Sequence, residues 1–203
     1  TMLTARLDRL ALRRGDRVLD LGCGDGRHVH GVHAFTHADV VGVDLDLPSL
    51  AKARAGLAAL DSGPGAVGFA QCDAGNVPFP DASFDVVLIS EVLEHLPDPA
   101  VALAEAARLL EPRGKLVVSV PRAWPERLCW AFAPGEDGYG DQPGGHVRIF
   151  RERQLRDLVA GHGFSFLRRH FAHGLHTPYW WLQTMFWKTR ETNGAVAAYR
   201  RFL

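Results

Sequence analysis

Residues 18–26 read Val18-Leu19-Asp20-Leu21-Gly22-Cys23-Gly24-Asp25-Gly26, an apolar run that leads into three glycines at alternating positions. A second apolar run, 40–43, ends in the acid Asp44. The pattern predicts a strand, a glycine turn and a helix start, followed by a second strand with a carboxylate at its tip. Because glycine lacks a Cβ, it allows positive φ and lets a ligand lie against the main chain. We therefore expect half of a nucleoside-binding crevice, with Asp44 accepting hydrogen bonds from a ribose diol.

The glycine spacing separates two classes of ligand. Dinucleotide-binding folds use G-x-G-x-x-G and hold a pyrophosphate at the helix N-terminus, whereas this turn reads G-x-G-x-G. The turn also carries Asp20 and Asp25, which would repel a pyrophosphate. Acids at this position suit a ligand with a cationic amino acid end.

Later segments repeat the alternation of apolar strands and turns. They are Gln71-Cys72-Asp73-Ala74, the stretch 79–90, Glu91-Val92-Leu93-Glu94-His95-Leu96 and the stretch 109–121. Together with the glycine turn, these segments resemble, in the same order, the motifs of the class I S-adenosylmethionine (SAM)-dependent methyltransferases. The resemblance covers residues 17–121 and continues weakly to residue 171.

The resemblance implies a SAM site at residues that match the family's motifs. Asp20 and the main chain of Gly22, Cys23 and Gly24 would face the methionine end, Asp44 the ribose, Leu45 the adenine ring, Asp73 and the amide of Ala74 the adenine edge, and the Ser90 carbonyl the methionine ammonium. For Asp44 and Asp73 the alternative is a hydrogen bond that merely closes a strand end or turn.

Methyl transfer to a hydroxyl requires loss of a proton, and therefore a base or a metal. His95 is the first candidate base; it lies four residues after Glu91, so a helix would place both on one face and let Glu91 orient it. A structural role for His95 is the alternative. His146, which follows two glycines, is the second candidate.

Composition narrows the class of protein. The chain has 203 residues, of which 47% are hydrophobic and 23% charged, and its net charge is zero with neutral histidines. These values are typical of a globular domain and make nucleic acid an unfavoured partner. Three cysteines without a framework spacing favour a reducing compartment, and no leader or membrane-spanning run is visible, so we expect a cytoplasmic protein.

Alternating strands and helices predict an α/β fold with a doubly wound, mostly parallel sheet and helices on both faces. We expect strands at 17–21, 39–44, 66–71, 85–90, 115–120 and 164–171, with the seventh strand of the family uncertain, and helices at 3–13, 26–36, 48–60, 98–110 and 151–161. We interpret 1–203 as a single methyltransferase domain: 1–121 as the SAM-binding core, 122–147 as a lid or substrate loop, and 148–203 as a part with a substrate or interface role.

Aromatic residues gather near the C-terminus, at Trp180, Trp181, Phe186 and Trp187. They would suit a peripheral membrane or lipid contact, a homodimer interface or a helix that covers the sheet. The ten histidines include two clusters, at 28–37 and 170–176, but neither has a cysteine or carboxylate at a recognisable metal-binding spacing. We therefore expect no metal site.

The sequence thus predicts a SAM-dependent methyltransferase that acts on a small-molecule acceptor. The favoured acceptor atom is a hydroxyl oxygen of an apolar, ring-bearing, lipid or glycoside substrate. The alternatives are a C-methyltransferase of quinone type, a non-catalytic SAM-binding module and, least favoured, an NAD-dependent oxidoreductase.

Overall fold

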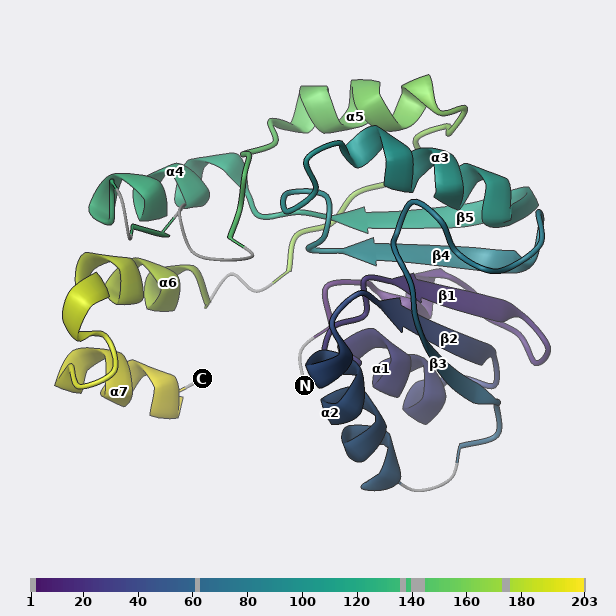
Figure 1. Cartoon of the computed structure of the whole chain (residues 1–203), viewed down its shortest axis with the longest axis horizontal. Helices are drawn as coiled ribbons and strands as arrows, with labels where there is room; N and C mark the ends of the chain where they lie inside the picture. Colours follow the sequence, from purple (N-terminus) through teal and green to yellow (C-terminus); the bar gives the residue numbers. More distant parts are fainter. Residues whose placement is uncertain (1–2, 61–62, 136–137, 140–144, 173–175, 203) are drawn as a thin grey trace.

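Five parallel strands form one sheet in the computed structural model, which describes residues 3–202 except 61–62, 136–137, 140–144 and 173–175 (Figure 1). The strands lie in the order β3-β2-β1-β4-β5. They are β1 (Arg17–Leu21), β2 (Asp39–Asp44), β3 (Val67–Gln71), β4 (Phe84–Ser90) and β5 (Leu110–Ser119). The order reverses between β1 and β4, and ligands of such sheets bind beyond the carboxyl ends of the strands at this reversal.

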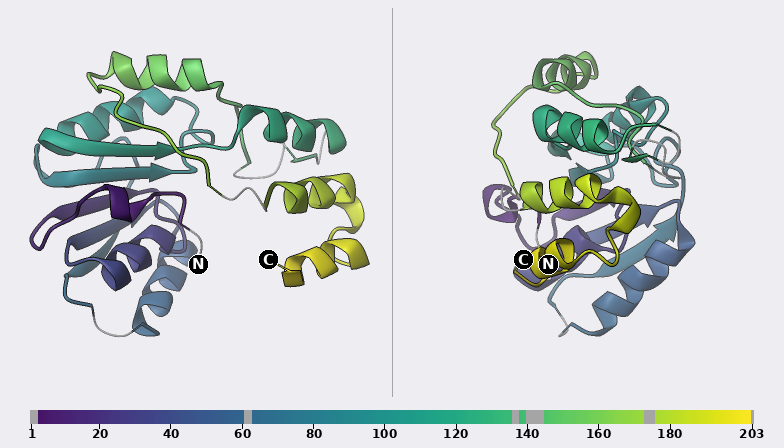
Figure 2. Two further views of the ribbon diagram at one scale, coloured as in Figure 1. Left: turned by 180° about the vertical axis from the view of Figure 1, so that it is seen from behind. Right: turned by 90° about the vertical axis from the view of Figure 1, so that its left-hand side faces the viewer.

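Helices cover both faces of the sheet, as predicted (Figure 2). On one face, Val18 and Leu88 belong to a core that includes residues of α1 (Arg27–Phe35) and α2 (Leu47–Ala58). On the other face, Leu19 and Ile89 belong to a core with α3 (Pro99–Leu109) and the apolar side of α5 (Glu152–Gly161). Alternate residues of β1 and β4 therefore serve opposite cores, because strand side chains alternate between faces.

Two helices start at aspartates that have a proline one or two residues later in the sequence. Asp46 Oδ2 accepts a hydrogen bond from the Ser49 amide at 2.9 Å at the start of α2. Asp98 Oδ1 accepts from the Ala100 amide at 3.0 Å at the start of α3. These caps satisfy amides that have no partner within the helix, which explains why the starts of both helices could be predicted closely.

The C-terminal helices lie to one side of the sheet (Figures 1 and 2). Helix α4 (Ala123–Phe132) lies beside α6 (His176–Met185), and α7 (Gly194–Phe202) lies beside α6. The rings of Trp124 and Trp181 are 5.3 Å apart, and Trp181 Nε1 donates to the Pro125 carbonyl at 3.2 Å. The stretch 122–147 is thus not a simple loop, because it begins with a helix that the aromatic residues pack against α6; residues 136–137 and 140–144 of this predicted lid lie outside the described residues.

The predicted helix over 3–13 is wrong. Only the 3₁₀ turn η1 (Leu7–Arg9) forms there. The amides of Thr4 and Ala5 both donate to Nε2 of the buried His28, at 3.2 and 3.3 Å, instead of entering a helix. Tertiary contacts with α1 therefore override the helical periodicity of this segment.

The predicted sixth strand over 164–171 is also wrong, because these residues form no strand. Phe166 lies under the Arg156 guanidinium, 3.6 Å from the ring centroid, and Phe171 under Arg122 at 4.4 Å. Both phenylalanines nevertheless stay more than half exposed, at 56% and 61%, so this segment does not bury the apolar side chains that a strand of a parallel sheet requires. Within the described part of the chain, no strand follows β5, so no seventh strand is found there either.

Of the four aromatic residues proposed as an interfacial patch, only Trp180 is exposed. Trp187 stacks against Arg190 at 3.8 Å, and Trp181 faces α4. Membrane or dimer contact through these residues stays a prediction. None of the described helices has the length and apolar character needed to span a bilayer.

Candidate active site

The glycine turn joins β1 to α1 at the carboxyl edge of the sheet. The amides of Gly22 and Cys23 donate to the Val43 carbonyl at 2.8 and 2.9 Å, which ties the turn to β2. Gly22 has φ +77°, and a Cβ there would lie 2.5 Å from Val92. Gly24 has φ +52°, but the space in which its Cβ would lie contains no atom within 4 Å. The turn thus packs tightly at Gly22 and leaves room for a ligand at Gly24.

The Asp44 carboxylate borders the open space beside Gly24. Its Oδ2 accepts from the Gly24 amide at 2.7 Å, and its Oδ1 accepts from the Asp46 amide at 2.9 Å. Leu45 beside it is 65% exposed, an apolar surface over which a flat ring would fit. The half-buried carboxylate therefore has a fixed orientation, with lone pairs left on both oxygens to accept from a diol.

The predicted adenine-edge residues lie next to Asp44. The amide of Cys72 donates to the Asp44 carbonyl at 3.2 Å, so the segment with Asp73 and Ala74 follows directly. Asp73 is exposed, and its Oδ1 accepts from the Gly75 amide at 2.7 Å. This is the turn bond that the sequence left open as an alternative, and it leaves the role of Asp73 in ligand binding a prediction.

Asp20 is the buried acid of the glycine motif. Its side chain is 1% exposed, and neither carboxylate oxygen has a hydrogen-bond partner among the described residues. The pKa of Asp20 is raised to about 7, mainly by burial; the charge of Arg27 lowers this pKa and the charge of Asp44 raises it. An unsatisfied buried carboxyl fits a site that receives a cationic ligand, because a nearby positive charge would stabilise its ionised form.

A hydroxyl network lies at the carboxyl ends of β4 and β5. Ser90 Oγ is 2.6 Å from Thr4 Oγ1, 3.0 Å from Ser119 Oγ and 3.4 Å from Arg27 Nη2. Ser119 Oγ also donates to Glu91 Oε1 at 3.0 Å. Thr4 was missed by sequence reasoning, because the predicted helix over 3–13 gave no reason to bring the N-terminal segment to this edge. Arg27, at the start of the predicted helix over 26–36, was not singled out either.

Glu91 and His95 do not share a helical face, contrary to the prediction, because residues 91–98 form a series of turns. Glu91 has φ +56°, a rare conformation for a residue with a side chain. Its carboxylate accepts from Ser119, whereas His95 Nδ1 lies 3.1 Å from the Gly145 carbonyl and donates to it. The turn therefore directs the two side chains to different partners.

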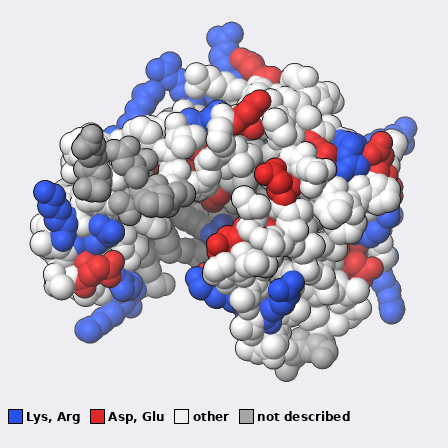
Figure 3. Space-filling view, viewed as in Figure 1, with Lys and Arg blue, Asp and Glu red and all other residues white. Residues whose placement is uncertain are grey.

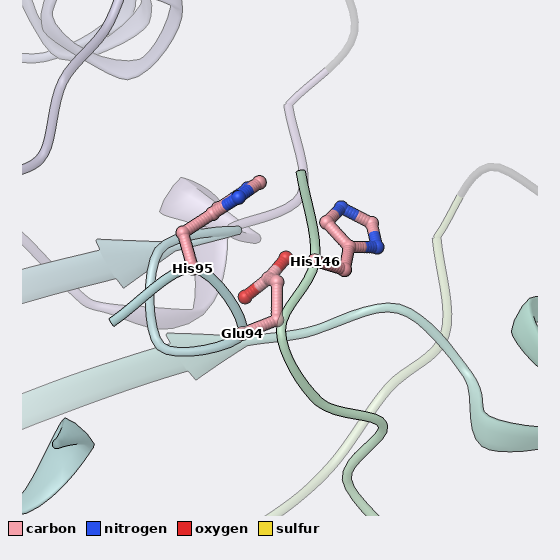
Figure 4. Close-up of side chains that lie close together, drawn as sticks. All are labelled: Glu94, His95 and His146. Carbon is pink, nitrogen blue, oxygen red and sulfur yellow. The ribbon is translucent and has the colours of Figure 1, made fainter. Parts of the chain in front are cut away.

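His95, His146 and the buried Glu94 lie close together (Figure 4). The two imidazole rings meet edge to face with centroids 4.7 Å apart. One nitrogen or oxygen atom of each of the three residues, of the kind that can bind a metal ion, lies within 4.8 Å of the other two. Burial, followed by the charge of Glu91, raises the pKa of Glu94 to about 8. The sequence spacing did not indicate this cluster, because the loop that ends at His146 brings together residues about 50 positions apart.

His146 has a partner that sequence reasoning also missed. Its Nδ1 lies 2.5 Å from Oε1 of Glu126, which is 6% exposed in the first turn of α4. Trp130 Nε1 donates to the same carboxylate at 3.1 Å. Apart from the aromatic residues around it, no feature of the sequence indicated that Glu126 belongs to the site.

An open cavity of about 2070 Å³ lies beside this edge. Arg27, Glu91, Glu126, Tyr139 and His146 line it near the carboxyl ends of β4 and β5, together with Trp124 and Trp181. The cavity continues along the outer side of β5 to α5, which accounts for its large volume. Asp44, Leu45, Asp73 and His95 are not among its lining residues. Arg27 lines the cavity and lies 3.4 Å from Ser90, which ends β4 at the same edge of the sheet as the glycine turn.

Comparison with known proteins agrees with this geometry. Residues 19–118 match a family described as "Methyltransferase domain". The chain is 40% identical over 121 residues to 27-O-demethylrifamycin SV methyltransferase of Amycolatopsis mediterranei, covering 58% of this chain and 43% of that protein. It is 37% identical over 131 residues to a ubiquinone biosynthesis O-methyltransferase of Hahella chejuensis, covering 64% and 53%. The Haemonchus contortus phosphoethanolamine N-methyltransferase 2 complex with SAM has the same fold, with a TM-score of 0.64 at 20% identity over 95% of this chain and 43% of that chain.

The fold is the Rossmann-like fold of the class I SAM-dependent methyltransferases, and residues 19–118 form a methyltransferase domain of this family. It spans about half the length of the curated relatives that it matches.

Arg27 fits the carboxylate of the methionine end of SAM, because it lies near Ser90 and lowers the pKa values of Asp20 and Glu91 through its charge. A charge-assisted bond contributes about 1.5–3 kcal/mol, so we expect Arg27→Met to weaken S-adenosylhomocysteine binding about 10- to 150-fold. Calorimetry with 5′-methylthioadenosine, which lacks the amino acid end, should show little change. Arg153→Met, on the exposed side of α5, is the matched control; equal losses for both ligands would contradict the assignment.

Proposed function

We propose that this chain transfers the methyl group of SAM to a hydroxyl oxygen of a small, ring-bearing or otherwise apolar acceptor, a lipid or glycoside included. The observation that carries the proposal is the position of His146, which lines an aromatic-walled cavity next to the Ser90 edge. We propose a cofactor site made by one set of residues: Asp20, Gly22, Cys23, Gly24, Asp44, Leu45, Asp73, Ala74 and Ser90, with Arg27 added.

Several features of the site support SAM as the ligand. The space over Gly24, the oriented Asp44 carboxylate and the unsatisfied carboxyl of Asp20 suit, in turn, a nucleoside, its ribose and a cationic amino acid end. Asp25 is exposed in the same turn and has a Lys52 neighbour at 3.6 Å. An acid at this position disfavours the pyrophosphate of NAD.

The cavity wall supports an acceptor with apolar or ring character. Trp124 and Trp181 form one side, and Tyr139 packs edge to face on His146 with centroids 5.8 Å apart. Aromatic walls with a few polar groups are typical of small-molecule sites. The relatives that act on 27-O-demethylrifamycin SV and in ubiquinone biosynthesis carry names that agree with O-methylation of such compounds. Lys and Arg are interspersed with acids on the face shown in Figure 3, which offers no broad basic surface there for nucleic acid.

Methyl transfer requires the protein to align SAM with the acceptor and to accept one proton from the acceptor hydroxyl. Bound SAM supplies a methyl group on a positively charged sulfur. The acceptor oxygen forms the new C–O bond as the C–S bond breaks, and the electron pair of that bond stays on sulfur. The hydroxyl proton passes to a base, for which His146, on the cavity wall, and the neighbouring His95 are the candidates; Glu91 also lines the cavity. Holding the two reactants in line supplies several kcal/mol of the barrier.

Two measurements test the proposal. Isothermal titration should show binding of SAM and S-adenosylhomocysteine but none of NAD. Incubation with methyl-tritiated SAM and a panel of phenols, catechols, quinones and lipid or sugar alcohols should move tritium into a methyl ether, identified by mass spectrometry. Tight NAD binding would overturn the class, and a C-methylated quinone as the sole product would overturn the hydroxyl acceptor. SAM binding without transfer to any probe would favour a non-catalytic binding module.

A further inference from the structure

Glu126 is a buried acid whose charge must be balanced inside the protein. It is 6% exposed and lies where α4 enters the cavity wall. Its Oε1 accepts from Trp130 Nε1 at 3.1 Å and lies 2.5 Å from His146 Nδ1. A longer contact of 3.5 Å joins its Oε2 to the hydroxyl of Tyr139. A buried carboxylate with several donors is an oriented acceptor rather than a surface charge.

We propose that Glu126 is a positioning residue that makes His146, rather than His95, the base for the acceptor hydroxyl. This inference rests on the proposed function. A carboxylate is an acceptor only, so the short contact requires the hydrogen on His146 Nδ1. The lone pair of the neutral ring is then on Nε2, the other side of the imidazole. Both His146 and Glu126 line the cavity.

The surroundings of His146 favour its protonated form after the proton has been taken up. Burial lowers the pKa of His146, but the hydrogen bond and charge of Glu126, together with the charges of Glu94 and Glu91, raise it above the ordinary value overall. The groups that face the ring are Glu126 and Tyr139 from the α4 side and Glu91, Glu94 and His95 from the turn after β4. Proton uptake by His146 thus converts the contact of a neutral ring with the Glu126 carboxylate into a buried ion pair.

His95 is less suited to this task. Its Nδ1 donates to the Gly145 carbonyl at 3.1 Å, so the partner of this nitrogen is a neutral group, whereas Nδ1 of His146 meets a carboxylate. It is also not among the residues that line the cavity in the described part of the chain. We therefore assign His95 a supporting role, in which it packs against the edge of the His146 ring.

The test is Glu126→Gln, which keeps the shape and an acceptor oxygen but removes the charge. Nitrogen-detected NMR of the histidine rings, with His146 assigned from His146→Gln, should show the Nδ1–H form in the parent protein. In Glu126→Gln the pKa of His146 should fall, because the hydrogen bond to a carboxylate and the charge of Glu126, which both raise this pKa, are removed. Glu191→Gln, an exposed change in the C-terminal part, should leave the ring unchanged. An unaltered His146 titration in Glu126→Gln would overturn the proposal without bearing on SAM binding.

The kinetic arm uses whichever phenol or catechol of the panel is methylated. Glu126→Gln should lower the single-turnover rate at neutral pH about 10- to 100-fold, less than removal of the base itself. The acid limb of its pH–rate profile should move to lower pH, since the histidine loses its proton at lower pH. SAM affinity measured by calorimetry should stay the same. An unshifted profile, or activity that is lost with EDTA and restored by Mg²⁺ or Zn²⁺, would overturn the assignment, the latter because a metal would then activate the hydroxyl.

Discussion

His146→Gln is expected to lower methyl transfer about 10²- to 10⁴-fold, the usual effect of removing a general base. Glutamine keeps a polar side chain of similar reach, but it cannot take up the hydroxyl proton. Because His146 lines the acceptor cavity and not the nucleoside space, SAM affinity should be unchanged. Single-turnover rates at saturating SAM and acceptor measure the loss, and calorimetry measures the affinity.

His95→Gln is the matched comparison, because it changes the neighbouring ring in the same cluster. We expect a much smaller loss from it, since His95 Nδ1 is bound to a neutral carbonyl and the ring does not border the cavity. The reverse order, with His95→Gln the more damaging change, would restore His95 as the base and remove His146 from that role.

Asp44→Ala is expected to weaken SAM binding by about 10- to 150-fold. Its carboxylate would accept from the ribose diol, a charge-assisted contact of about 1.5–3 kcal/mol. The same side chain also binds the amides of Gly24 and Asp46, so its removal loosens the turn that shapes the nucleoside space. The effect should therefore lie toward the upper end of this range. Calorimetric titration with S-adenosylhomocysteine gives the dissociation constant directly.

Asp39→Ala provides a control on the same strand. Asp39 lies at the opposite end of β2, where its Oδ1 accepts from the Ala66 amide at 2.7 Å. Its replacement removes a comparable backbone contact without touching the carboxyl edge, so thermal stability can fall while SAM affinity stays the same. Unchanged affinity in Asp44→Ala would remove the ribose assignment, and with it the main support for the predicted nucleoside site.

The placement of the predicted cofactor residues at one edge of the sheet could be predicted because it depends on local sequence; their role in binding stays a prediction. The glycine turn follows β1 directly, and Asp44 and Ser90 end their own strands, so the parallel sheet brings them to one edge. The same holds for helices that begin at a capping aspartate with a proline in the first helical turn, such as α2 and α3. Each of these features depends on residues within a few positions of one another.

The acceptor side could not be predicted in this way. The helix expected at 3–13 was replaced by contacts of Thr4 and Ala5 with the distant His28. The strand expected at 164–171 did not form, and its phenylalanines stay more than half exposed beside arginine side chains.

The sequence by itself therefore determined the parallel sheet, the glycine turn and the acids at the strand tips, because hydrophobic periodicity and turn chemistry are local properties. Only the tertiary structure decided that Glu126 meets His146, that Arg27 lies near Ser90, and that α6 packs on α4 to complete an aromatic wall. These pairs are far apart in the chain or come from elements whose packing no periodic pattern specifies. Which residues meet in these pairs depends on burial and on the pairing of opposite charges, and both arise only once the chain has folded.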